Sequence, residues 1–432
     1  MITRRSPDKR QGDKSALFWH YYNFIAGAMI ASQIFFLLQT YRNYRYAVKK
    51  STTKHQGYHP RVLLTIPCKG IDNSFEENIS SFFNLDYDNF YLCFVVADTT
   101  DPAYEKLREL KTKLASNSQT LDVRIVAAGG ATLCSQKIHN LLYSCKNAPK
   151  DVEVFAFADS DATVGPDWLN HLVYPLRKSK HGASTGYRWF VPAQNNLASL
   201  VLSAINGKIA QLLGPTIFNQ AWGGSMAIRV ETFNQIKLDK IWQRAVSDDL
   251  TLSYAVKKAN KKIIFAPGCL VASYEKTTWP GLFEFARRQF LITRVTIPAT
   301  WWFGLGSSIY SLAGLWAGAA IVILAAVSST NMLALYAAVP VVFFFGQVCR
   351  SILRQKMIAA LLPEDAGKMK PAMVADILGN CIWSWVLFVS IVSSAFGRTI
   401  TWRGIHYKLV GPTETIIIKE EDRRQRTEYR DS

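Results

Sequence analysis

The sequence predicts an α/β domain with a mostly parallel sheet covered by helices, joined to α-helical transmembrane segments. Between residues 61 and 294, short apolar runs alternate with amphipathic stretches of helical period, a pattern typical of βαβ units. On both sides of this region lie uncharged apolar runs of about twenty residues, the length that crosses a bilayer. The chain of 432 residues is long enough to hold both parts.

The N-terminal part is predicted to contain one membrane anchor, residues 16–41, after a basic tail of residues 1–15. Residues 16–38 carry no charged side chain, and Tyr41 and Arg42 follow them, as aromatic and basic residues do at a membrane interface. A secretory signal peptide is the alternative. The apolar run is long for a signal peptide, and no small-residue cleavage site follows it, so the anchor is favoured.

The α/β region, residues 61–294, contains several short apolar runs that are predicted to be strands. We expect strands at residues 61–67, 90–97, 123–126, 152–158 and 262–266, and helices at 75–84, 103–115 and 136–145. Parallel sheets bind their ligands beyond the carboxyl ends of the strands. The residues that follow each strand are therefore the first candidates for a functional site.

Charged residues follow three of these strands. They are Pro67 with Lys69, Asp98 with Asp101, and the run Asp159-Ser160-Asp161. Alternate residues of an extended turn point the same way, so Asp159 and Asp161 can present two carboxylates to a divalent cation that also holds a diphosphate. Such a tripeptide is most often a solvated turn. Its place directly after a buried strand favours a metal site.

The second half of the region holds a glycine motif, Gly223-Gly224-Ser225-Met226, and an acidic pair, Asp248-Asp249. The glycines would let the backbone approach a sugar or diphosphate, so the motif is a candidate for the acceptor side of a site. The acidic pair opens a predicted helix. One carboxylate could be an N-cap, and the other a general base that takes the proton of an acceptor hydroxyl. We favour Asp249 over Asp248 as the base.

A basic helix is predicted from residue 283. It carries Arg287, Arg288, Gln289 and Arg294. Arginine binds phosphate oxygens through two parallel hydrogen bonds, so this helix is a candidate clamp for a diphosphate. A basic face resting on lipid head groups is the alternative, and both readings stay open. The Trp-rich residues 295–304 are expected to lie at the membrane interface.

The C-terminal transmembrane region is predicted at residues 305–397. Its apolar runs cover residues 305–327, 332–348 and 377–396, and a short uncharged break predicts a hairpin between the first two. Basic residues flanking the apolar runs indicate a multi-pass membrane protein with the α/β region in the cytosol. If the α/β region and the basic tail, residues 398–432, both lie in the cytosol, the chain between them must cross the membrane an even number of times. Three full crossings are then one too many. One run is therefore re-entrant or interfacial, and the sequence leaves open which.

The charge and the cysteines exclude other classes of protein. The formal net charge is +18, from 50 Lys and Arg against 32 Asp and Glu. Because the basic residues cluster beside apolar segments and no nucleic-acid-binding module is visible, phosphates of lipids or nucleotides are the expected partners, not nucleic acid. The seven cysteines are scattered and never paired as C-x-x-C. This spacing argues against a disulfide framework and a zinc site.

The motifs follow one another in the order of a known family. They are Pro67-Cys-Lys-Gly-Ile-Asp72, Asn84-Leu-Asp-Tyr87, Gln136-Lys137-Ile-His-Asn140, Asp159-Ser-Asp161, the glycine motif, the acidic pair and Trp402-Arg403-Gly404 near the end. Over nearly the whole chain the sequence resembles the ceramide glucosyltransferases, glycosyltransferase family 21, and their bacterial relatives. Each motif alone is weak, but their order and spacing are specific.

This resemblance implies a GT-A nucleotide-sugar fold, a UDP-hexose donor, a divalent cation (Mn²⁺ or Mg²⁺) and inversion at the anomeric carbon. By position it assigns Asp98 or Asp101 to the family's first acid, Lys137 to the donor-binding helix, Asp161 to the metal and Asp249 to the base. The chain departs from the family at the Q/R-x-x-R-W signature. There it has Ala286, Gln289 and Phe290, so Arg287, Arg288 or Arg294 is expected to supply the positive charge.

The expected activity is transfer of a hexose, glucose by the resemblance, from a UDP-sugar to a lipid hydroxyl at the cytosolic face. A processive polysaccharide synthase is the runner-up, but that class needs more membrane spans and an intact signature. A membrane scaffold without activity would not need the intact acidic residues. The acceptor stays open among ceramide, diacylglycerol, a sterol and a hopanoid-type alcohol, as does the oligomeric state.

Overall fold

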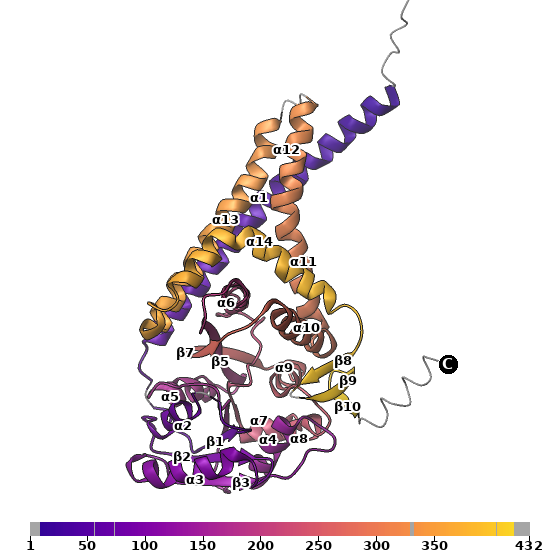
Figure 1. Ribbon diagram of the computed structural model, residues 1–432. Helices are drawn as coiled ribbons and strands as arrows, with labels where there is room; N and C mark the ends of the chain where they lie inside the picture. Colours follow the sequence, from indigo (N-terminus) through magenta and orange to yellow (C-terminus); the bar gives the residue numbers. More distant parts are fainter. Residues whose placement is uncertain (1–8, 56, 73, 329–331, 403, 419–432) are drawn as a thin grey trace, which may run out of the picture.

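The computed structural model describes residues 9–418 except 56, 73, 329–331 and 403. An α/β domain occupies one end of the molecule, and long helices extend from one side of it (Figure 1). The predicted class, a mostly parallel sheet with covering helices plus long apolar helices, is confirmed.

The sheet of the α/β domain has seven strands in the order β3-β2-β1-β4-β6-β5-β7. Their bounds are β1 Val62–Pro67, β2 Phe90–Val96, β3 Asp122–Ala127, β4 Val154–Ala158, β5 His181–Pro192, β6 Ser225–Arg229 and β7 Lys262–Glu275. The first four strands are parallel, β6 runs antiparallel to both its neighbours, and β5 and β7 pair in parallel. The predicted strands are all present, whereas β5 and β6 were not predicted.

Helices cover both faces of this sheet. They are α2 Phe75–Phe83, α3 Pro102–Leu114, α4 Gln136–Lys146, α5 Trp168–Val173, α7 Val230–Gln235, α8 Leu238–Trp242 and α9 Asp248–Lys258. Side chains of a strand alternate between faces. Val62 and Leu64 of β1 pack into the core that includes α2, α3 and α5, while Leu63 packs into the core that includes α4, α8 and α9. Burial on both faces explains why these strands are continuous apolar runs.

Four helices among the described residues are long and apolar enough to cross a membrane. They are α1 Lys9–Ser51, the helix made of α11 Pro298–Leu312, a π-helical turn and α12 Gly318–Val327, then α13 Leu333–Leu361 and α14 Lys370–Ser393. Helices α1, α12 and α13 extend together away from the sheet, with α13 packed against both others (Figure 1). The helix α1 already begins within the predicted basic tail, and the Trp-rich interfacial segment forms the first turns of α11.

The segment after α14 was predicted to be a tail, but it folds through residue 418. It forms an antiparallel sheet of β8 Thr399–Trp402, β9 Ile405–Gly411 and β10 Glu414–Ile418. Ile400 and Tyr407 are buried with Val246 and with Leu291 of α10 Trp279–Thr296. This apolar contact fixes the C-terminal sheet to the α/β domain. The remaining residues of the expected tail, 419–432, lie outside the described part.

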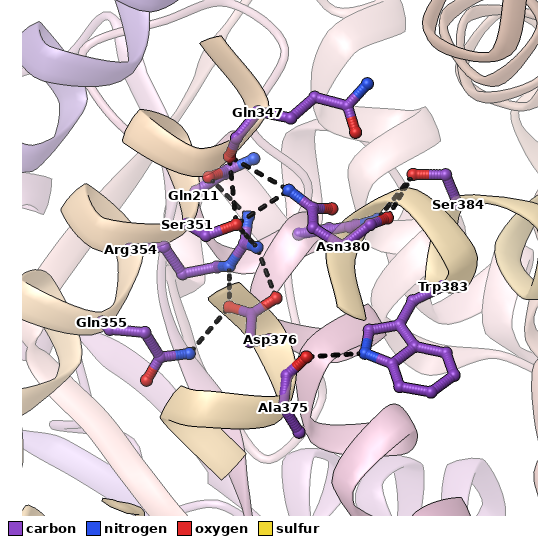
Figure 2. Close-up of polar contacts among 11 residues, drawn as sticks. Gln211, Gln347, Ser351, Arg354, Gln355, Ala375, Asp376, Asn380, Trp383 and Ser384 are labelled. Carbon is purple, nitrogen blue, oxygen red and sulfur yellow. Dashed lines mark hydrogen bonds and ion pairs between the residues drawn. The ribbon is translucent and has the colours of Figure 1, made fainter. Parts of the chain in front are cut away.

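The long helices are tied to the α/β domain through α6, Leu197–Ala210, and the residues just after it. Arg354 of α13 donates to both carboxylate oxygens of Asp376 on α14, at 2.7 and 2.6 Å, and to Oε1 of Gln211 at 2.9 Å (Figure 2). Both members of the ion pair are buried. At the end of α1, the hydroxyl of Tyr46 donates to the carbonyl of Phe265 in β7 at 2.9 Å. The domain is thus fastened to three of the long helices.

Candidate active site

Three of the predicted site residues meet at one point. Lys137, near the start of α4, lies with its Nζ 2.7 Å from Oδ1 of Asp159, which follows β4, and 3.0 Å from Oδ2 of Asp248, which opens α9. Lys137 and Asp159 follow the carboxyl ends of β3 and β4, the edge at which parallel sheets bind ligands. Asp248 joins them from α9, so the structure brings together three residues that are distant in the sequence.

The charges in this cluster are strongly coupled. Burial raises the pKa of Asp248 to about 6, the carboxylates of Asp249 and Asp159 raise it too, and Lys137 partly opposes them. Burial alone would lower the pKa of Lys137, but the carboxylates of Asp159, Asp248 and Asp249 outweigh it and raise this pKa. Lys137 is thus a permanent cation at neutral pH, and Asp248 is charged only above about pH 6.

Asp249 is held in place but remains partly exposed, in contrast to the buried Asp248. Its carboxylate accepts hydrogen bonds from the backbone N–H of Gly223 (3.1 Å), the backbone N–H of Leu250 (2.7 Å) and the hydroxyl of Ser247. Ser247 is the N-cap of α9, since its Oγ accepts from the N–H of Leu250. With the cap supplied by Ser247, Asp249 is the more accessible carboxylate of the acidic pair.

The glycine motif is shaped by the side chains around it. A Cβ at Gly223 would lie 2.5 Å from Oδ2 of Asp248 and 2.6 Å from Nζ of Lys137, and one at Gly224 would lie 2.8 Å from Oδ2 of Asp159. Glycine is needed at Gly223 because the ion-paired cluster touches the backbone, and at Gly224 chiefly because the indole of Trp222 would lie 2.1 Å from a Cβ.

The other two residues of the motif lie elsewhere. Ser225 and Met226 open β6 and are fully buried, and Ser225 Oγ accepts a hydrogen bond from the indole Nε1 of Trp168 at 3.1 Å. Gly223 and Gly224 border the site. Ser225 and Met226 point into the core of the domain.

The predicted donor-side residues after β1 and β2 lie on the same edge of the sheet. Asp101 caps α3, accepting from the N–H of Ala103 (2.9 Å), and it also accepts from the N–H of Gly70 (2.8 Å) in the loop after β1. Pro67 ends β1, and Lys69 and Asp98 are exposed beyond the strand ends. Asp101 therefore fixes the shape of this loop, whether or not it touches a ligand.

In the structure, the arginines predicted to clamp a diphosphate contact other parts of the chain. Arg287 donates to the carbonyl of Phe396 at 3.0 Å, and Arg294 donates to the carbonyls of Ala395 and Gly397. These carbonyls follow the C-terminal end of α14, where positive charge is favourable. Arg288 lies over the ring of Phe285, and Gln289 is exposed. Arg287 and Arg294 of α10 therefore hold the segment after α14 against α10.

Sequence reasoning missed Arg188, which lies in the unpredicted strand β5. Its Nη1 lies 3.5 Å from Oδ2 of Asp161, and its guanidinium lies 5.5 Å from the ring centre of Trp222, next to the glycine motif. An arginine between two aromatic residues, Tyr187 and Trp189, was visible in the sequence. Without the strand, no face could be assigned to it.

The acidic residues after β4, Asp159 and Asp161, fit a divalent cation that is held partly by the protein and partly by a substrate. Within the described residues no group of three or more His, Cys, Asp or Glu side chains could hold a metal ion by itself. Such cations often take only one or two carboxylates and complete their shell with substrate phosphates. Asp161 would offer carboxylate oxygens to such a cation, with its Oδ2 also facing Arg188 at 3.5 Å, and Oδ1 of Asp159 is paired with Lys137.

The α/β sheet, the carboxylates at its strand ends and the close-packed glycine motif define the class as a nucleotide-sugar-dependent glycosyltransferase. The sequence profile of "Glycosyl transferase family 21" matches residues 25–414. The chain belongs to this family, the ceramide glucosyltransferase family, and transfers a sugar from a nucleotide sugar. The resemblance drawn from the motifs is confirmed.

Several solved structures are also similar to this chain. A mannosyltransferase, PcManGT from Pyrobaculum calidifontis in complex with GDP-Man and Mn²⁺, is 15% identical, with 86% of this chain and 97% of that chain covered and a TM-score of 0.43. GalNAc-T7 with UDP, GalNAc and Mn²⁺ is 14% identical, with 55% and 51% covered and a TM-score of 0.36. The glucosyl-3-phosphoglycerate synthase of Mycobacterium tuberculosis, with phosphoglyceric acid, is 13% identical, with 56% and 84% covered and a TM-score of 0.35. All three likenesses are distant.

Proposed function

We propose that this protein transfers a hexose, glucose in the first instance, from a UDP-sugar to a lipid hydroxyl, with inversion and at the cytosolic face of a membrane. The proposal rests on the exposure and the orientation of the Asp249 carboxylate. It is a partly exposed carboxylate, oriented by three hydrogen bonds, beside an ion-paired cluster that holds the rest of the site rigid.

In this mechanism Asp249 is the general base. It takes the proton of the acceptor hydroxyl while that oxygen attacks the anomeric carbon, and the bond from this carbon to the diphosphate oxygen breaks with its electron pair remaining on UDP. One displacement inverts the anomeric centre. The hydrogen bonds from Gly223 and Ser247 fix the direction of the carboxylate. A divalent cation held by Asp161 would supply charge neutralisation for the departing diphosphate.

The surface beside the site supports a lipid acceptor. Ile217 and Phe218 precede the glycine motif by a few residues, and their side chains are 71% and 60% exposed. Phe218 stacks on Phe303 of α11 with ring centres 5.8 Å apart, and Gln220 Nε2 donates to Thr300 Oγ1 of α11 at 3.0 Å. The segment that leads into the site therefore contacts the first turns of a helix long enough to cross a membrane. An apolar substrate could reach Asp249 along this path without entering water.

The position of the C-terminal sheet supports a topology with three crossings. Because β8, β9 and β10 pack on α10 of the α/β domain, both must lie on the same side of the membrane. The chain between them then crosses an even number of times. The antiparallel helices α11–α12 and α13 supply one pair of crossings. Helix α14 packs against α6 and α10 and runs along the domain (Figure 1). We infer that α14 is the non-crossing apolar segment, with the N-terminus on the opposite side.

The test is transfer from UDP-[¹⁴C]glucose to a total membrane lipid extract by purified protein, with product measured in the organic phase. We expect Asp249→Asn to abolish transfer while UDP binding persists, because the isosteric amide cannot take up a proton. Asp122→Asn, at the exposed start of β3, is the matched control and should retain activity. Transfer by Asp249→Asn at the wild-type rate would remove the proposed base.

A further inference from the structure

Arg188 on β5 faces Asp161, the carboxylate predicted to bind a metal ion. The Nη1 of Arg188 lies 3.5 Å from Oδ2 of Asp161. Its guanidinium lies over the ring of Phe190, 4.7 Å from the centroid, and 5.5 Å from that of Trp222. Stacking on aromatic faces fixes the plane of a guanidinium while leaving its N–H groups directed outward. Arg188 is thus a rigid donor at the edge of the acidic site.

Most of the hydrogen-bonding capacity of Arg188 is unused. A guanidinium has five N–H donors. Within the described residues Asp161 is the polar partner of Arg188, through one contact at the long end of the hydrogen-bonding range. Its side chain is only 18% exposed, so water reaches it poorly. A half-buried guanidinium with free donors is suited to an anion that presents several oxygens.

Two acidic groups, Asp161 and Glu275, interact with Arg188. Burial raises the pKa of Glu275 at the end of β7; Asp161 and Asp72 also raise it, whereas Arg188 lowers it. Asp161 and Glu275 therefore lie within electrostatic reach of the guanidinium. A divalent cation at Asp161 would relieve this excess of negative charge, so that Arg188 and the cation could bind one polyanion from two sides.

Four other basic residues predicted for the site, Lys137, Arg287, Arg288 and Arg294, have partners of their own. Lys137 pairs with two carboxylates, and Arg287 and Arg294 bind carbonyls at the end of α14. Arg288 lies over the ring of Phe285. Arg188, on β5, is the cation that the structure places opposite Asp161.

We propose that Arg188 binds the diphosphate of the sugar donor, supplying positive charge from β5 opposite Asp161. The inference rests on the proposed function and names a further residue of the same site. The guanidinium donates to oxygens of the second phosphate, the one that carries the sugar, and stabilises the negative charge that this phosphate gains when its bond to the anomeric carbon breaks. The rings of Phe190 and Trp222 keep it in position.

The test compares nucleotides that differ by this phosphate. Affinities of UDP and UMP are measured by calorimetry with Mn²⁺ for wild type, Arg188→Gln and Arg188→Lys, with GDP and GMP in parallel. Losing charge-assisted hydrogen bonds should weaken UDP binding by about tenfold to a hundredfold in Arg188→Gln, with UMP affinity nearly unchanged. Arg188→Lys, which keeps the charge without the paired donors, should fall between them. Arg124→Gln is the matched control, since Arg124 also combines an ion pair with an aromatic contact but lies on β3.

The outcomes separate this inference from the function on which it rests. A preference for UDP over UMP that is unchanged in Arg188→Gln would overturn the inference, and so would an equal loss of both nucleotides, which would make Arg188 a structural partner of Asp161. A wild-type protein that binds neither UDP nor GDP would instead overturn the proposed donor, and the role of Arg188 with it.

Discussion

The ion pair of Arg354 and Asp376 is buried where α13, α14 and the end of α6 meet, and its removal should loosen this junction (Figure 2). Asp376 accepts from Nε and Nη2 of Arg354 and from Nε2 of Gln355 at 2.6 to 2.8 Å. In Asp376→Asn one of these oxygens becomes an NH₂ group that faces donors, and the charge of Arg354 is left buried without its counter-charge.

The expected cost follows from that geometry. Removing one partner of a buried ion pair destabilises a protein by about 3–5 kcal/mol. With an unfolding entropy of roughly 2.1 cal/mol/K per residue, a chain of 432 residues has about 0.9 kcal/mol/K. Asp376→Asn should therefore lower the Tm by roughly 3–6 °C.

The assay is thermal unfolding of the detergent-solubilised protein, followed by tryptophan fluorescence. Arg354→Met combined with Asp376→Asn should recover part of the loss, because no uncompensated charge remains. Glu105→Gln, which breaks the exposed pair with Arg108 on α3, should change the Tm by less than about 1 °C. A Tm for Asp376→Asn within 1 °C of wild type, or a double variant whose loss equals the sum of the single ones, would refute this reasoning.

Three further predictions concern the active site. Gly223→Ala should lower transfer at least about tenfold, because its Cβ would lie 2.5 Å from Oδ2 of Asp248, whereas Gly165→Ala, with open space around it, should behave as wild type; equal activities would contradict the packing. UDP binding and transfer should decline as the pH falls through about 6, because Asp248 then gains a proton and loses its hold on Lys137. Asp248→Asn removes the titrating carboxyl, so the decline near pH 6 should disappear, and a decline that persists would exclude Asp248 as its cause. Asp161→Ala should make UDP affinity independent of Mn²⁺. If Mn²⁺ still strengthens UDP binding in this variant, Asp161 is not the metal ligand.

The first half of the fold could be predicted because its physical signals are local. Strands β1, β2 and β4 are buried on both faces, so they appear as continuous apolar runs. The acidic residues that follow them could be placed at one edge because parallel strands end there. What the sequence could not show was the pairing itself, in which Lys137 joins carboxylates from two other elements.

Strand β5 was missed because the buried residues of its first half are mostly small or polar. Ser184 and Thr185 are fully buried, with their hydroxyls bonded to the carbonyls of Leu172 and Ser225. Gly186 is required because a Cβ there would lie 2.1 Å from the carbonyl oxygen of Cys269 in β7. These are tertiary contacts that no local pattern reveals, and with β5 the site residue Arg188 was missed as well.

The basic helix shows what arginine spacing alone leaves open. Arginine spacing on α10 indicated a phosphate clamp, but the partners of Arg287 and Arg294 are carbonyls about a hundred residues later in the chain. The same distance hid the C-terminal sheet, whose short strands bury only alternate residues such as Ile400 and Tyr407. Basic and partly apolar, this segment was predicted to be a tail.

The central claim is that Asp249 activates a lipid hydroxyl for transfer of a hexose. The most direct measurement is lipid mass spectrometry of cells that express the wild-type chain or Asp249→Asn at equal levels. We predict a hexosylated lipid that is present with the wild type and absent with the variant, and its mass identifies the acceptor. A hexosylated lipid in equal amounts in both, or none in either, would contradict the claim.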